Sequence, residues 1–171
     1  MKITVKNTWK EVTLAEFMAV SNIEEDQSLI GRPLARGVKL LEILSSATEE
    51  DILQVDGDTL TKLLNQITFM AQKPKPTRAK TIKIDGVEYG YEKGQTITAG
   101  EMISIESLLQ EGANGKSTMD RQLAILIRPM VDGKIEPFKL EGLEAREELF
   151  LDTLKVPFFF GLLVNSLPTE K

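Results

Sequence analysis

The segment Gly112-Ala-Asn-Gly-Lys-Ser-Thr118 is the part of the chain that comes closest to a phosphate-binding loop. Such a loop cradles phosphates with backbone N–H groups, follows a strand, and needs a glycine five residues before the Gly-Lys-Ser triplet. Position 110 is glutamine, and the residues before the segment predict a helix. The sequence therefore favours an ordinary loop between helices, with Lys116 and Ser117 left as candidates for an enzyme that uses a lysine and a serine.

Two sets of carboxylates also have spacings that suggest chemistry. Asp56-Gly-Asp58 has the form of the start of a calcium loop, but leucine at position 60 occupies a ligand position, so a turn that caps a helix is favoured. Glu101 and Glu106 are five residues apart and do not share one face of a helix. Glu101 instead completes the capping box Thr98-Ala-Gly-Glu101, so acid–base catalysis by this pair is not expected.

The chain contains neither histidine nor cysteine. No imidazole titrates near neutral pH, and no thiol can act as a nucleophile, form a disulfide or bind a metal. The sequence therefore predicts no cofactor and no metal site. It favours a protein that is not an enzyme and that works by contacting other proteins.

The charge and the hydropathy pattern narrow the kinds of partner. The 171 residues carry a formal net charge of −5, which argues against nucleic acid as a partner. The longest apolar stretch, residues 156–164, is about half the length of a membrane span, so no membrane partner is expected. No secretory signal follows Met1, and we expect the protein to fold in the cytoplasm.

The periodicities predict a mostly helical α+β fold, with an N-terminal helical unit, one central β-hairpin and C-terminal helices. Capping boxes at Thr13-Leu-Ala-Glu16 and Thr98, together with Pro33 in a first turn, mark helix starts. Asp85-Gly86 between two alternating segments predicts a type I′ hairpin. Further helices are expected after Thr48, after Asp58 or Thr59, from Ser117 to Ile127, over residues 143–154 and from Pro157. An edge strand is expected over residues 2–6.

The prolines of Lys73-Pro-Lys-Pro76 exclude a helix interior. We expect a single compact domain over residues 1–171, with a possible sub-domain boundary at residues 73–80. That boundary would separate a strand plus helices in residues 1–72 from a hairpin plus helices in residues 81–171.

Two surfaces are candidates for contacts with other proteins. The C-terminal apolar segment places neighbouring side chains about 100° apart around a helix, so it is either a core helix or an interface. Its candidate interface residues are Phe158, Phe159, Phe160, Leu162 and Leu163. The second surface is a positive run with no acid between residues 73 and 84, which is either a contact patch or a solvated linker and strand edge. Its residues are Lys73, Lys75, Arg78, Lys80 and Lys83.

Several segments, read in order, resemble small proteins encoded among the structural genes of tailed bacteriophages, especially phages of Bacteroidetes-type hosts. They are Trp9-Lys-Glu-Val-Thr-Leu-Ala-Glu-Phe17, Leu40-Leu-Glu-Ile-Leu44, Thr48-Glu-Glu-Asp-Ile52, Thr98-Ala-Gly-Glu-Met102, Leu123-Ala-Ile-Leu-Ile-Arg-Pro129, Arg146-Glu-Glu-Leu-Phe150 and Phe158-Phe-Phe-Gly-Leu162. The resemblance implies a virion component or an assembly factor similar to tail assembly chaperones. It implies no catalytic residues.

The expected function is therefore a non-enzymatic phage structural or assembly protein of the head-tail or tail region. Its partners would be other phage structural proteins or further copies of itself, in the host cytoplasm during assembly or in the virion. The alternative is a transient tail assembly chaperone absent from the mature particle. An alternative of another class is a small enzyme that uses carboxylates or the Lys116 and Ser117 pair.

Overall fold

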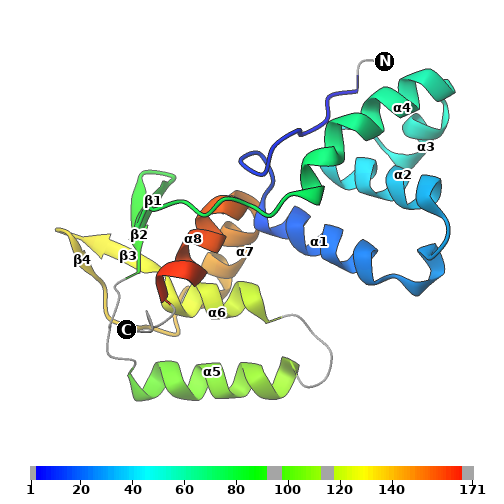
Figure 1. Cartoon of the computed structure of the whole chain (residues 1–171). Coiled ribbons are helices and arrows are strands. Elements are labelled where there is room, and N and C mark those ends of the chain that lie inside the picture. Colours follow the sequence, from blue (N-terminus) through cyan, green and yellow to red (C-terminus); the bar gives the residue numbers. More distant parts are fainter. Residues whose placement is uncertain (1–2, 92–97, 113–117, 167–171) are drawn as a thin grey trace, which may run out of the picture. The chain divides into compact units, whose positions relative to one another are not determined.

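The computed structural model describes residues 3–91, 98–112 and 118–166. It confirms a mostly helical α+β fold. The chain divides into two compact units (Figure 1). Unit 1 comprises Met1–Pro74 together with Lys155–Pro157, and unit 2 comprises Lys75–Leu154 together with Phe158–Lys171. The division after Pro74 falls within the proline-containing segment of residues 73–76.

Unit 1 is built from helices, most of which begin at side-chain caps. Its elements are α1 (Leu14–Glu25), η1 (Gln27–Leu29), α2 (Pro33–Leu44), α3 (Glu49–Leu53), α4 (Gly57–Gln66) and η2 (Ile67–Ala71). Thr13 and Thr48 each form a complete capping box, as the sequence predicts for Thr13. Asp56 caps α4, rather than Asp58 or Thr59, because its carboxylate accepts from the Thr59 N–H at 2.8 Å.

The expected strand at residues 2–6 is wrong in its extent. Among the described residues of this segment, Val5 alone forms a bridge, to Ser45. A second bridge joins Thr13 to Lys155, which is why the three residues Lys155–Pro157 belong to unit 1. Trp9 packs edge-on against Phe17 and Phe69 and donates from its indole N–H to the Gln72 carbonyl at 2.7 Å.

Unit 2 combines an antiparallel sheet with helices. The sheet order is β1-β2-β3-β4, from β1 (Thr81–Ile84), β2 (Val87–Gly90), β3 (Arg128–Val131) and β4 (Lys134–Ile135). The helices are α5 (Ala99–Gly112), α6 (Met119–Leu126), α7 (Leu143–Thr153) and α8 (Val156–Ser166). The first two residues of α8, Val156 and Pro157, belong to unit 1. The core of unit 2 contains the buried residues Ile125 and Phe159. It also contains Phe150, whose ring packs edge-to-face against that of Tyr89.

The sheet contains a second hairpin that corrects the expectation of a single one. Both hairpins turn on an Asp-Gly pair with positive φ, 48° and 83° at Asp85 and Gly86 and 50° and 74° at Asp132 and Gly133. These values fit type I′ turns, whose twist matches that of the flanking strands. The helix predicted from Ser117 to Ile127 ends one residue earlier, at Leu126, and the following residues Arg128–Val131 form β3, which pairs with β2. Ser117 itself lies outside the described residues.

Candidate protein-interaction surfaces

The segment of residues 112–118, which has some features of a phosphate-binding loop, begins at the last residue of α5. A helix therefore precedes it, and not the strand that such a loop requires. Lys116 and Ser117 lie outside the described residues. In the parts of the chain that the structure describes, no cluster of three or more Asp or Glu residues could hold a metal ion. Asp56 of the calcium-like segment serves as a helix cap, accepting from both the N–H and the hydroxyl of Thr59.

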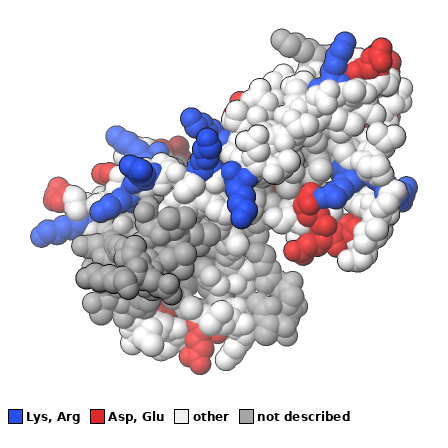
Figure 2. All heavy atoms as spheres, viewed as in Figure 1, with Lys and Arg blue, Asp and Glu red and all other residues white. Residues whose placement is uncertain are grey.

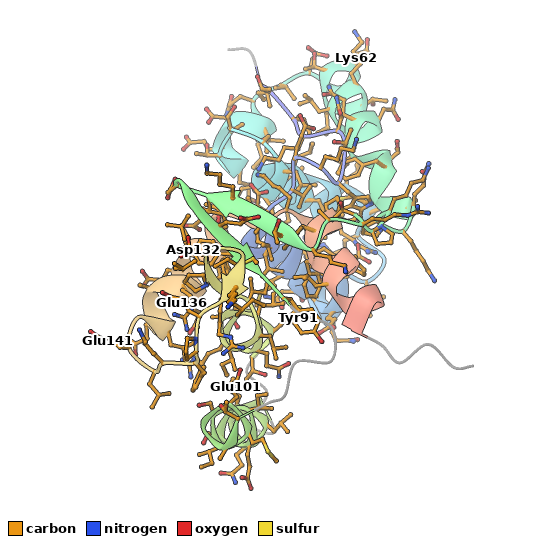
Figure 3. All side chains as sticks on the ribbon, turned by 90° about the vertical axis from the view of Figure 1, so that its left-hand side faces the viewer. Lys62, Tyr91, Glu101, Asp132, Glu136 and Glu141 are labelled. Carbon is orange, nitrogen blue, oxygen red and sulfur yellow. The ribbon has the colours of Figure 1, made fainter. Side chains whose placement is uncertain are left out.

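Glu101 is a buried structural residue of unit 2. One of its carboxylate oxygens accepts from the N–H and the hydroxyl of Thr98, both at 2.7 Å, and so closes the predicted capping box. The other oxygen lies 3.5 Å from the Arg128 guanidinium, on the side of α5 that faces α6 and the sheet (Figure 3). Glu106 is exposed on another face of α5, so the two carboxylates do not come together.

A half-buried arginine, Arg146, lies near this ion pair. Arg146 donates from Nε to the Ala124 carbonyl at 3.2 Å, and burial lowers its pKa below the ordinary value. Arg128 contributes to that lowering through like-charge repulsion, while Tyr89 and Glu136 oppose it. The Arg128–Glu101 pair joins β3 to α5, and the Arg146 hydrogen bond joins α7 to α6.

The Phe-rich segment is largely core. Phe158, Phe159 and Leu162 are buried, and Phe160 is half-buried against the Phe159 ring at a centroid distance of 5.2 Å. The side chain of Leu163 lies outside the described residues. Of the two interpretations left open by the sequence, burial therefore accounts for three of the five residues. These three side chains are not available to a partner while α8 keeps this position.

The basic segment is fully on the surface. Lys73, Lys75, Arg78, Lys80 and Lys83 are all exposed, and within the described residues none of them forms an ion pair. Lys73 belongs to unit 1 and the other four to unit 2. Blue side chains gather over β1 and the extended chain before it (Figure 2). The structure thus leaves this candidate contact surface accessible.

An apolar groove on unit 2 was not anticipated from the sequence. Its volume is about 310 Å³, and it is lined by Ile103, Ser104, Ser107, Leu108, Arg121, Ile125, Leu140 and Leu143. Ile103 and Leu140 at its rim are 63% and 69% exposed, whereas Leu108 and Ile125 at its base are buried. The periodicity of α5 identifies Leu108 as core, but adjacent apolar residues at 102–103 and 108–109 already signal more than one apolar face.

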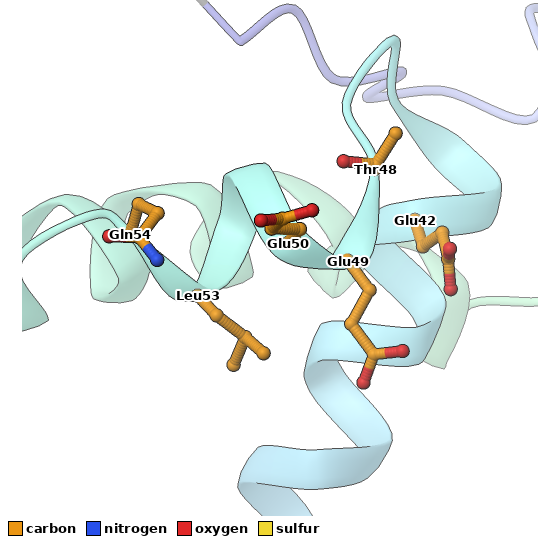
Figure 4. Close-up of a pocket in the computed structure, with 6 residues that line it drawn as sticks. All are labelled: Glu42, Thr48, Glu49, Glu50, Leu53 and Gln54. Carbon is orange, nitrogen blue, oxygen red and sulfur yellow. The ribbon is translucent and has the colours of Figure 1, made fainter.

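Unit 1 has an acidic groove of about 490 Å³ at the start of α3 (Figure 4). It is lined by Glu42, Thr48, Glu49, Glu50, Leu53 and Gln54. Lys39 forms ion pairs with both Glu42 and Glu49, and its hydrogen bond to Glu49 raises the pKa of Lys39. The groove therefore lies among exposed ion-paired side chains, and the exposed Leu53 side chain lies at its edge.

No family model, curated protein or solved structure matches this chain. Among the described residues, no helix has the length and apolar character needed to cross a membrane.

Proposed function

We propose that this chain is a non-enzymatic bacteriophage protein that acts in virion structure or assembly by contacting other proteins of the head-tail or tail region. The observation that carries the proposal is the apolar groove of unit 2, where Ile103 and Leu140 remain exposed around buried Leu108 and Ile125. Apolar side chains gathered around a surface groove are typical of protein contact sites. The lack of histidine and cysteine and the resemblance to phage structural-region proteins support the same proposal.

Two versions of this function differ in when the contact is broken. A virion component keeps its partner in the finished particle, and copies in a ring would multiply a weak contact into a stable one. A tail assembly chaperone covers an apolar segment of another protein and then leaves. Both versions use the groove, so location in the finished particle separates them.

The first experiment locates the chain during infection. Particles are purified from host cultures that produce it, and mass spectrometry quantifies the chain in the particles and in the soluble lysate. A fixed copy number per particle supports the virion component. Recovery only in the lysate, in a complex with a tail protein, supports the chaperone. Recovery with no phage protein in either fraction overturns the proposal.

The second experiment tests the groove itself. Ile103→Glu places a charge at the rim, and Ile30→Glu makes the same change at a residue of unit 1 that is 71% exposed. We expect Ile103→Glu to reduce association with the tail or particle protein at least tenfold and Ile30→Glu to leave it unchanged. Equal effects of the two variants would remove the groove from the proposal.

A further inference from the structure

Among the described residues, β1 is an edge strand of the unit 2 sheet, and its one neighbour there is β2. Facing residues of an antiparallel pair alternate between those that exchange hydrogen bonds and those that do not. Ile84 and Val87 close the two-residue turn, and the Lys80 backbone carbonyl accepts from the Tyr91 N–H. The even-numbered residues of β1 therefore form the backbone hydrogen bonds to β2. Thr81 and Lys83 therefore direct their backbone N–H and C=O groups away from β2.

The outward groups of Thr81 and Lys83 meet no other backbone or side-chain partner in the residues that the structure describes. An edge with free N–H and C=O groups is a template on which another strand can pair. β1 therefore offers hydrogen bonds to an extended segment, independently of any side chain.

Four cations flank this edge. Lys75, Arg78, Lys80 and Lys83 are exposed, and no acid interrupts residues 73–84. Glu88 is the cross-strand neighbour of Lys83, but the two side chains form no ion pair. The charge next to the free edge is therefore positive and available to an acidic partner.

The chain leading into β1 is also held in place. A Cβ atom at Gly161 would lie 2.3 Å from the Thr77 carbonyl oxygen, so α8 and this extended segment are in backbone contact. Pro76 further restricts the backbone around it. Because the segment is already ordered, a partner would bind with little additional loss of conformational entropy.

We propose that the free edge of β1, together with Lys75, Arg78, Lys80 and Lys83, binds an extended acidic segment of another protein, which adds as a fifth strand. The inference rests on the proposed function only in that the chain works through protein contacts, since it concerns a surface other than the groove. We do not propose a second copy as the occupant, because the acidic runs of the described residues, 24–26 and 49–51, lie in or at the end of helices. A free backbone edge pairs with a polypeptide and not with a nucleic acid, and Tyr89 is buried and cannot stack on bases.

The test uses the full chain and fluorescence anisotropy with three probes of about ten residues. They are a peptide alternating Glu and Val, a peptide alternating Lys and Val, and a single-stranded oligonucleotide. We expect binding of the Glu-Val peptide, weakening as salt rises, and no comparable binding of the other two. No binding of the Glu-Val peptide, or tighter binding of the oligonucleotide, overturns the proposal.

Two variants separate charge from strand pairing. Lys80→Glu with Lys83→Glu reverses the charge, whereas Thr81→Pro removes one outward N–H without removing a bond to β2, as edge strands tolerate. We expect each to weaken binding roughly tenfold, with the salt dependence reduced only by the charge reversal. Lys134→Glu, at an exposed lysine of β4, is the control and should stay within about twofold.

Hydrogen exchange supplies a readout that does not depend on affinity. The Glu-Val peptide should slow exchange of the Thr81 and Lys83 amides and leave those of β4 unchanged. Binding without this protection, or an unaltered affinity in Thr81→Pro, shows that the lysines attract the peptide without strand addition and overturns the proposal. The groove variant Ile103→Glu should bind the peptide normally, so a failure of the proposed function stays distinguishable.

Discussion

The polar contacts that stabilise unit 1 and unit 2 differ in how far apart their partners lie in the sequence. In unit 1 the polar contacts are mostly local. The side-chain oxygens of Thr13, Thr48 and Asp56 each accept from an N–H group three residues further along the chain. In unit 2, Arg128 reaches Glu101, Arg121 reaches Glu147, and Arg146 reaches Ala124. Local contacts are replaced easily by solvent, whereas a buried charge that loses its partner is costly, so the units should respond to different perturbations.

The aromatic residues allow the two units to be followed separately. The single tryptophan, Trp9, packs in unit 1, and the two tyrosines, Tyr89 and Tyr91, belong to unit 2. Tryptophan fluorescence therefore reports on unit 1, and the near-ultraviolet circular dichroism of tyrosine reports on unit 2. The predictions below use both signals on the full chain.

The largest effect is expected from breaking the buried ion pair of unit 2. Arg128→Met leaves Glu101 buried without its counter-charge, and we expect the tyrosine signal to report a loss of about 3–5 kcal/mol in urea unfolding. Adding Glu101→Gln removes the charge but keeps a side chain that can complete the capping box. The double variant should recover part of the loss. Additive losses would show that the ion pair is not the source of the effect.

Replacing a tightly packed glycine by alanine should destabilise each unit, by a different amount in each. A Cβ at Gly161 meets the Thr77 backbone oxygen at 2.3 Å, and a Cβ at Gly37 meets the Leu64 Cδ2 atom at 2.6 Å. The backbone cannot move aside as a leucine methyl group can, so Gly161→Ala should cost about 1–3 kcal/mol and Gly37→Ala less. Thermal unfolding ranks them. Gly57→Ala has open space and is the control; a larger cost there than at Gly161 would contradict the argument.

A smaller effect is expected from removing a cap in unit 1. Thr13→Ala removes the hydroxyl that accepts from the Glu16 N–H at 3.3 Å, and we expect a loss of about 1 kcal/mol. Urea unfolding followed by Trp9 fluorescence measures it. Thr13→Ser retains the hydroxyl and should behave as the native chain. If the serine variant were as unstable as the alanine variant, the cap would not be the cause.

The smallest effect is the acid sensitivity of unit 1. Burial raises the pKa of Glu16, but the hydrogen bonds from Lys6 and the Thr13 backbone outweigh it, so the pKa lies below its ordinary value of 4.5. Hydrogen bonds to Ser28, Thr48 and Thr59 likewise lower the pKa values of Asp26, Asp51 and Asp56 below 3.8. A lowered carboxyl pKa contributes stability that is present above the unfolded-state value and disappears as the pH falls through the folded-state value.

The stability of unit 1 should therefore decline as the pH is lowered through about 4.5 and below, as followed by urea unfolding with Trp9 fluorescence at successive pH values. Glu16→Gln should give a shallower decline, because this side chain no longer titrates. An unchanged slope in that variant would remove Glu16 from the explanation.

The helix starts of both units were predictable from the sequence because a cap and its N–H partner lie three residues apart. Thr13, Pro33 and Thr98 needed no tertiary information. The second hairpin was missed although Asp132-Gly133 matches Asp85-Gly86, because β3 contains a proline and extends an apolar run that reads as a helix. Its strand character depends on pairing with Tyr89 and Gly90, which lie far away in the sequence.

The candidate surfaces likewise divide into those that the sequence predicts and those that depend on tertiary packing. Exposure of Lys75, Arg78, Lys80 and Lys83 follows from their charge and was predictable. The groove was not, because the exposure of Ile103 depends on which face of α5 meets α6. The core position of Phe158 and Phe159 likewise depends on how much apolar surface the rest of unit 2 supplies, which no local pattern records.

The return of residues 155–157 to unit 1 has a consequence for synthesis of the chain on the ribosome. The Val156 N–H donates to the Val12 carbonyl at 3.1 Å, and the Lys155 ammonium donates to the Glu11 carbonyl, 144 positions away in the sequence. Residues 1–74 therefore emerge about 80 residues before their last partner, an interval of about 4–16 s at ordinary translation speeds. During that interval the nascent chain carries an incomplete first unit, with the backbone at Val12 open to chaperones or to a neighbouring nascent chain.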